Sequence, residues 1–365
     1  MTPTLPHPDP LPLPAPAWLL WFLLTLTFTL HVVPMNLVLG GSIVGLVARL
    51  RASRQPHAAA VASLVAKALP VLIATAVTMG VAALLFLQVL YGRLFFTSAV
   101  LLAVPWLAVV PTLIAAYYAA YAGRSSTRTV FAWVAALSFA AIAFVYANAM
   151  GLMLRPADFL PRFQASASGL HLNLGDPTLA PRFLHVLLAS LAMSGLAVAA
   201  AGGFVQRRDP GAGEWMAHHG VHLFAGATLL NFLPGFWWLA ALPQQTLLQF
   251  IGHDPFGTAC LTAGILAGVA AIGFAIPAAF SREARGLMKV AVACLLSSVV
   301  LMILVRDSAR TSVLRSAGFR GTEWVEPQWG PIVAFAALLV AAAASVWWMV
   351  GKLARAQKID TVAVQ

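Results

Sequence analysis

Long apolar segments alternate with short polar ones along the whole chain. Nine of them reach the length of about 18 residues that a helix needs to cross a bilayer. They lie at about 18–48, 60–90, 94–122, 129–153, 183–205, 216–242, 256–280, 286–305 and 331–351. The pattern predicts an all-α protein, a polytopic membrane helix bundle of about nine transmembrane helices.

The basic residues between these segments predict which way the bundle faces. The formal charge is +11, and 14 of the 22 Lys and Arg residues fall in the short inner connections if the amino terminus is placed outside. This bias follows the positive-inside rule. It predicts an outer amino terminus, a cytoplasmic carboxyl terminus, and two long outward-facing connections at about 154–182 and 306–330.

The composition agrees with a membrane location and excludes several classes of function. Hydrophobic residues make up 61% of the chain and charged residues 9%, whereas about a quarter of the residues of soluble domains are charged. The sequence lacks a basic stripe with interleaved aromatics, so we expect no nucleic-acid partner. It also lacks a Walker-type phosphate loop and a dinucleotide fingerprint. Cys260 and Cys294 both lie in apolar runs, which argues against a disulfide framework or a cysteine metal site.

The acidic residues argue against a proton-coupled transporter, which normally buries a carboxylate near the middle of the membrane. We expect all 11 Asp and Glu residues to lie in tails, loops or helix ends. They are Asp9, Asp158, Asp176, Asp209, Glu214, Asp254, Glu283, Asp307, Glu323, Glu326 and Asp360.

Two histidines inside apolar segments are the main candidates for chemistry. His31 lies in the first predicted helix and His185 near the start of the fifth. An ionisable side chain at membrane depth needs a partner and is by default a functional candidate, and histidine is a common metal ligand. Both helices start on the outer side in the predicted topology, so both imidazoles fall in the outer half of the membrane. The alternative is a neutral histidine that is hydrogen-bonded across a helix interface.

Four further histidines are weaker candidates. His218, His219 and His222 begin the sixth predicted helix, and their spacings of three and four place them near one another on one side of that helix. They form either a metal cluster or a polar helix start at headgroup level, and no acidic or cysteine ligand accompanies them. His253 precedes the seventh helix on the same side as His31 and His185. It is either a second axial ligand or part of a helix-entry turn.

In the first predicted helix His31 is followed by Val-Val-Pro-Met-Asn-Leu-Val-Leu-Gly. This segment resembles the first helix of subunit I of cytochrome bd-type quinol oxidases, where a similar pattern supplies a haem ligand. The segment that contains Gln88 and Gly92, and the segment Ala147 to Met153, resemble family motifs of the second and fourth helices. Gly175-Asp-Pro-x-x-x-x-Phe-Leu-His185 resembles the family motif that opens the fifth helix. The resemblance implies that His31 and His185 are ligands of haem iron, with His185 on the low-spin haem b.

The resemblance also implies an organisation of the chain. Residues 1–17 are a proline-rich extramembrane tail, and residues 18–205 are the bd-oxidase-like haem-binding region. Residues 206–353 are a divergent half in which the similarity fades, although Val305 to Arg310 lies where the family has a conserved arginine motif. Residues 354–365 are a cytoplasmic tail. The connection at about 243–255 predicts a shortened member without the long quinol-binding loop.

Several family residues are missing, and these differences change the expected function. The third helix has no glutamate, Cys294 to Ile303 has no acid for a high-spin haem, and residues 256–280 contain no methionine to pair with His185. We suggest His253 as the sixth ligand instead. Without acids at an oxygen site, proton delivery for oxygen reduction is hard to build.

The resemblance therefore implies a haem b protein in the bacterial inner membrane that carries electrons between the quinone pool and a respiratory partner. That partner is a c-type cytochrome or another redox subunit, and a second membrane subunit is a further expected partner. Two alternatives are a cofactor-free scaffold or transport subunit and a true quinol oxidase with a rearranged oxygen site. Quinol oxidation would make the chain an oxidoreductase subunit.

Overall fold

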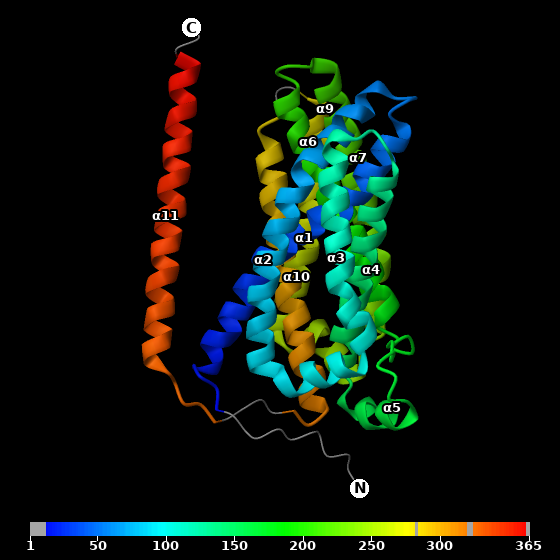
Figure 1. Ribbon diagram of the computed structural model, residues 1–365, viewed down its shortest axis with the longest axis vertical. Coiled ribbons are helices and arrows are strands. Elements are labelled where there is room, and N and C mark those ends of the chain that lie inside the picture. Colours follow the sequence, from blue (N-terminus) through cyan, green and yellow to red (C-terminus); the bar gives the residue numbers. More distant parts are fainter. Residues whose placement is uncertain (1–11, 282–283, 320–323, 363–365) are drawn as a thin grey trace.

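The computed structural model describes residues 12–281, 284–319 and 324–362. In these residues nine helices are long and apolar enough to cross a membrane, which confirms the predicted all-α bundle (Figure 1). They are α1 (Ala17–Arg51), α2 (Pro56–Leu101), α3 (Ala103–Ser125), α4 (Val130–Met153), α6 (Leu179–Val205), α7 (Pro210–Ala240), α9 (Pro255–Phe280), α10 (Leu287–Ser316) and α11 (Trp329–Val362).

Short helices fill the connections at one end of the bundle. The connection from α4 to α6 contains η1 (Pro156–Asp158) and α5 (Phe159–Ala165), and the connection from α7 to α9 contains α8 (Gln244–Leu248) and η2 (Gln249–His253). We call this end of the molecule the α5 end. Helix α1 begins there and α11 ends at the opposite end (Figure 1), as an odd number of spans requires.

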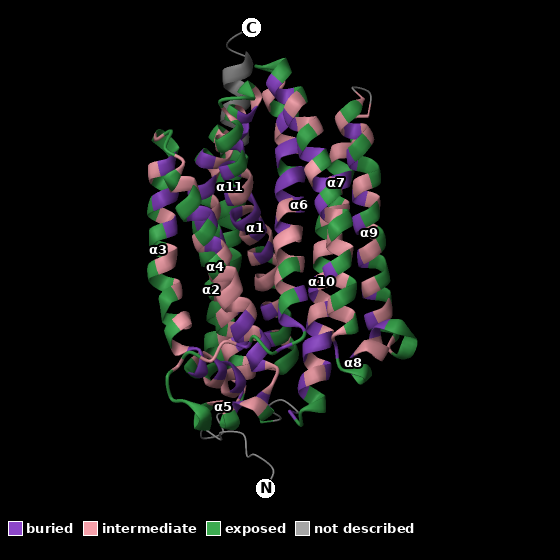
Figure 2. Ribbon diagram, turned by 90° about the vertical axis from the view of Figure 1, so that its right-hand side faces the viewer, coloured by how far each residue is buried: buried purple, intermediate pink, exposed green. Residues whose placement is uncertain are grey.

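The long helices pack as two groups that meet along α1 and α6. In the first group α1 packs on α2 and α4, and α3 packs on α4; in the second α6 packs on α7, and α9 on α10. Helices α1 and α6 join the groups, and buried residues are concentrated on them (Figure 2). The contact is close at Gly40, where a Cβ atom would be 2.0 Å from the carbonyl oxygen of Ser190. The Ser190 hydroxyl donates a hydrogen bond of 2.6 Å to Oδ1 of Asn36.

Two predicted helix boundaries are wrong. The second helix was expected to end near residue 90, but α2 continues to Leu101 through a kink at Tyr91 (φ −129°, ψ 26°). The turn to α3 is at Leu102, three residues before Pro105, in an otherwise apolar segment. The eighth helix was expected to end at residue 305, but α10 continues to Ser316. Arg306, Asp307 and Arg310 therefore lie inside a helix and not in an outer connection.

Helix α11 stands apart from the other long helices (Figure 1). The most apolar part of its described span contains no buried residue. The segment before it returns to the start of the chain, because Leu13 N–H donates to the carbonyl of Trp324 (2.9 Å) and Glu326 N–H donates to the carbonyl of Leu13 (3.0 Å). Leu13 and Val325 thereby form a short parallel bridge.

We expect Gly220→Ala to lower the thermal stability of the protein, because α6 and α7 approach too closely at Gly220 for a side chain. A Cβ atom there would be 2.5 Å from the backbone nitrogen of Ala199, and such overpacking costs about 1–3 kcal/mol. Gly226→Ala is the matched control on the same helix, since nothing lies within 4 Å of its Cβ position. Thermal unfolding in detergent should show a lower Tm for the first variant only. Equal Tm values for the two variants would contradict the packing described.

Candidate functional site

His31 lies in α1 and faces α2. Its Nδ1 atom is 2.8 Å from the carbonyl oxygen of Ala76, and because a carbonyl only accepts, Nδ1 carries the ring proton. Nε2 then has the free lone pair, which is the form in which an imidazole binds a metal. Gly80, one turn further along α2, lies against the ring: a Cβ atom there would be 2.8 Å from Cε1 of His31. A residue larger than glycine at position 80 would displace the imidazole.

His185 lies in α6 and faces α7. A Cβ atom at Gly235 would be 3.3 Å from Nδ1 of His185. That Nδ1 atom is buried and makes no hydrogen bond of normal geometry in the described residues, although the backbone of Asn231 is near. Oδ1 of Asn231 and Nε1 of Trp238 are also buried without such a partner there. Buried polar atoms normally have a partner, so this interface has the donor and acceptor atoms that a ligand would use.

Three arginines, which we call the arginine cluster, lie beside both histidines. Arg306 and Arg310 belong to α10 and Arg182 to α6, and Arg306 is close enough to the other two for electrostatic repulsion. Arg306 also lies near His31. Arg182 precedes His185 by three residues and shares its face of α6. The site therefore combines two imidazoles with an excess of positive charge.

Asp307 is a buried carboxylate within α10, which corrects the expectation that every acid lies in a tail, loop or helix end. It forms an ion pair with Arg310 and accepts a hydrogen bond from the indole N–H of Trp21 in α1. Arg310 lies over the ring of Tyr91, with Cζ 4.7 Å from the ring centroid. This set of contacts joins α10 to α1 and to the kink in α2.

A network of polar side chains at the α5 end holds the connection after α5 against the bundle. Oδ1 of Asn148 accepts from the backbone N–H of Asn173 (2.9 Å), and Asn173 donates to Asp176 (3.1 Å). The other carboxylate oxygen of Asp176 accepts from the hydroxyl of Thr178 (2.8 Å), and that hydroxyl accepts from Arg182 (2.8 Å). The network therefore positions Arg182, which belongs to the arginine cluster.

The structure places the weaker histidine candidates elsewhere. His253 is exposed in η2, beside Gly252 with φ +117°, whereas His185 faces α7. His218 stacks on Phe280 and His219 on Trp215, so their rings do not converge. His222 meets the edge of the same Phe280 ring. Within the described residues no group of three or more His, Cys, Asp and Glu side chains is arranged to hold a metal ion.

Several residues of the site carried little or no signal in the sequence. Gly80 and Gly235 are ordinary residues of apolar helices, and their positions against the histidines depend on how the helices pack. Arg306 and Arg310 did carry a signal, since they lie where the resembled family has its arginine motif. The apolar pattern nevertheless placed them outside the membrane span.

Comparison with known proteins identifies a structural relative. No family model matches the chain, and no curated protein matches its sequence. Among solved structures, the bd oxidase from Geobacillus thermodenitrificans matches with a TM-score of 0.62 and 13% sequence identity. The match covers 92% of this chain and 98% of that chain. The two chains share a fold.

The extent of the match bears on the prediction that this chain is shortened. Because 98% of the matched chain is covered, the present chain lacks no long segment relative to it. The loss of a long quinol-binding loop stays a prediction, because a likeness at 13% identity shows the fold alone. The bd-oxidase-like fold that the sequence resemblance implied is confirmed.

We expect Asp307→Asn to lower the free energy of unfolding by about 3–5 kcal/mol, because it leaves the buried Arg310 without its counter-charge. Unfolding in mixed micelles with increasing sodium dodecyl sulfate measures this change. The double variant Asp307→Asn, Arg310→Gln should recover part of the loss. Asp158→Asn, in a partly exposed ion pair, is the control and should change the value by at most about 1 kcal/mol. Equal effects of Asp307→Asn and Asp158→Asn would contradict a buried ion pair.

Proposed function

We propose that this chain is a haem b protein of the bacterial inner membrane that carries electrons between the quinone pool and a respiratory redox partner. His31 and His185 are the proposed axial ligands. The observation that carries the proposal is the state of His31: its Nδ1–H is bound to the Ala76 carbonyl, and Nε2 is left for iron. The similarity in fold to a bd oxidase also supports this proposal.

The residues around the two histidines fit a haem. His31, His185, Arg182 and Arg306 are enclosed by protein yet keep partial accessible surface, as expected of side chains that face a ligand. Gly80 and Gly235 allow the α2 and α7 backbones to lie close to the two rings. A buried haem needs an imidazole ligand, and each histidine would supply one.

The arginine cluster fits the carboxylates of a haem. Arg182, Arg306 and Arg310 carry three positive charges. Asp307 forms an ion pair with Arg310, and Asp176 is near enough to Arg182 to attract it electrostatically. Charged groups away from water are stable only with compensating partners. Arg182 and Arg306, the two members not paired with Asp307, would hold propionate groups, since Arg binds carboxylates through paired N–H groups.

A haem iron, when bound, supplies one-electron transfer. The chain's own residues would set the reduction potential of the haem and its access to water. Apolar side chains of α1, α2, α6 and α7 would exclude water, and the nearby arginines would favour the reduced, less positive state. Quinol would be the electron donor or acceptor on the membrane side. A c-type cytochrome or another redox subunit would be the partner outside, and a second membrane subunit would complete the assembly.

A quinol oxidase with a rearranged oxygen site is a second candidate, and Asp307 is the observation that favours it. Oxygen reduction consumes protons, and a buried carboxylate is a group that delivers them. Asp307 is held by Arg310 and Trp21, however, and α3 contains no acidic residue. We therefore favour electron transfer. Quinol-dependent oxygen consumption by the purified protein would instead favour the oxidase.

Haem content of the purified full-length protein tests the proposed function. The pyridine haemochrome spectrum should show haem b, and both His31→Ala and His185→Ala should lose at least about one equivalent, because each removes an iron ligand. His57→Ala, at the opposite end of the bundle, is the control and should keep the full content. A folded protein without haem would reject the redox function and favour the cofactor-free scaffold or transport subunit.

Gly80→Ala should disturb the His31 site without removing the ligand. The added Cβ would be 2.8 Å from the imidazole, so we expect a shifted reduced-minus-oxidised spectrum or a loss of roughly half of the haem at that site, since small displacements of a ligand weaken metal binding. Gly92→Ala is the control on the same helix, because its Cβ would meet only Phe96 at an ordinary 3.6 Å. An unchanged spectrum in Gly80→Ala would argue against His31 as a ligand.

A further inference from the structure

We propose that the end of the bundle opposite α5 binds an anionic phospholipid. Its phosphate would lie on the basic residues around the turn between α3 and α4, and part of one acyl chain would enter an apolar pocket between α1, α2, α3 and α4. This site is separate from the haem site proposed above and does not depend on it.

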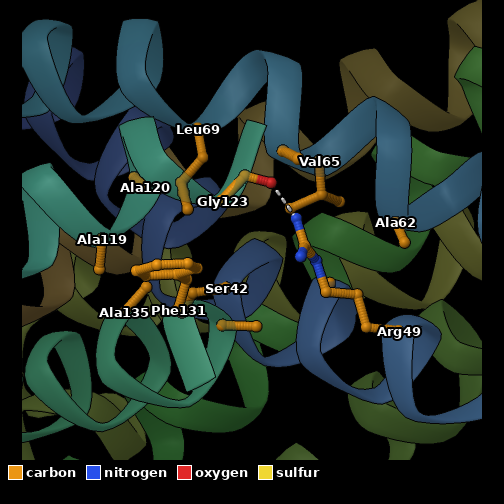
Figure 3. A pocket seen from close by; sticks show the side chains of 13 residues that line it. Ser42, Arg49, Ala62, Val65, Leu69, Ala119, Ala120, Gly123, Phe131 and Ala135 are labelled. Atoms are coloured by element: carbon orange, nitrogen blue, oxygen red, sulfur yellow. Dashed lines mark hydrogen bonds between the residues drawn. The ribbon is translucent and has the colours of Figure 1, made fainter. Parts of the chain in front are cut away.

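The pocket is formed mainly by small apolar residues at the ends of four helices (Figure 3). Gly45 of α1, Ala66 of α2, Ala120 of α3 and Ala135 of α4 contribute to its walls, together with the ring of Phe131. Apart from Ser42, the polar side chain that lines it is that of Arg49 (Figure 3). The cavity, of about 30 Å³, has apolar walls that suit about two methylene groups of a chain, and the single charged residue suits an anion.

Arg49 remains positively charged in this arrangement. Its Nη1 donates to the carbonyls of Ser126 (2.7 Å) and Arg128 (3.4 Å), and its Nη2 donates to the carbonyl of Gly123. These carbonyls orient the guanidinium at the end of α3, but they carry no formal charge. These contacts therefore leave its charge available to attract an anion.

The surroundings of the pocket are strongly basic. Arg51 and Arg54 follow Arg49, and Arg124 and Arg128 flank the turn between α3 and α4. The sequence contains no acidic residue between Asp9 and Asp158, so α1 to α4 supply no carboxylate. In the part of the chain that the structure describes, the ion pairs lie at the α5 end, on Arg155, Arg162 and Arg310.

An anionic phospholipid matches both the basic residues around the turn between α3 and α4 and the apolar pocket beside them. Basic pockets between transmembrane helices on the cytoplasmic side bind anionic headgroups, and each basic residue near the surface adds to the attraction. The predicted topology places this end on the cytoplasmic side. A neutral quinone would fill the apolar part but would leave the arginines without a counter-ion.

Native mass spectrometry of the full-length protein in detergent tests the site with dioleoyl phosphatidylglycerol and dioleoyl phosphatidylcholine. We expect phosphatidylglycerol to bind about tenfold more tightly, and the double variant Arg124→Gln, Arg128→Gln to lose about tenfold of that affinity. The matched control is Arg207→Gln, Arg208→Gln in the exposed turn between α6 and α7 at the same end. It removes the same charge and should leave the affinity within about twofold.

The pocket is tested separately with a variant that fills it. Ala132→Leu narrows the pocket and should weaken phosphatidylglycerol binding, whereas Ala141→Leu, exposed on the same helix, should not. Three results would overturn the site: equal binding of the two lipids, equal loss in the two arginine double variants, or no effect of Ala132→Leu. Displacement of phosphatidylglycerol by glycerol 3-phosphate at equal concentration would show that no acyl chain is bound and would also overturn it.

Discussion

The contact between α1 and α6 at Gly40 determines where the candidate ligands stand relative to each other. Glycine allows the α1 backbone to approach Ser190, and the hydrogen bond from Ser190 to Asn36 fixes the rotation of the two helices. His31 precedes Gly40 by nine residues and His185 precedes Ser190 by five, which at the rise of an α-helix is roughly 13 Å and 7 Å. Because α1 and α6 both begin at the α5 end, both imidazoles lie on the same side of this contact. Each then faces the partner helix of its own group, α2 for His31 and α7 for His185.

Positive charge inside the bundle is the second constraint. In lipid an uncompensated guanidinium is costly, and here the compensation is divided between several elements. Asp307, which also accepts from the indole N–H of Trp21, pairs with Arg310. Aromatic faces lie near Arg306 and Arg310, and the network of Asn148, Asp176 and Thr178 serves Arg182. The connection after α5 is thus part of the site and not only a link between helices. At the other end of α1 to α4 the arginines lie near the membrane surface, where lipid headgroups are available as counter-charges.

The sequence was sufficient for the features that depend on composition alone. Nine spans followed from hydropathy, and His31 and His185 stood out because an imidazole is unusual in an apolar helix. Features that depend on packing were not accessible. The extension of α10 was missed because Arg306, Asp307 and Arg310 lower the local hydropathy, although inside the bundle they lie close to one another and the acid is paired. The positions of Gly80 and Gly235 matter only because an imidazole ring packs against each, and the kink at Tyr91 lies just after the predicted end of the second helix.

The bridge between Leu13 and Val325 has a consequence for biogenesis. Leu13 and Val325 are separated by more than 300 residues of sequence. Val325 is therefore synthesised only after eight of the nine described spans. Helix α1 must therefore insert and find α2 and α6 while the segment before it is still unpaired. Docking of that segment can follow only after the segment at Trp324 to Glu326 has been made.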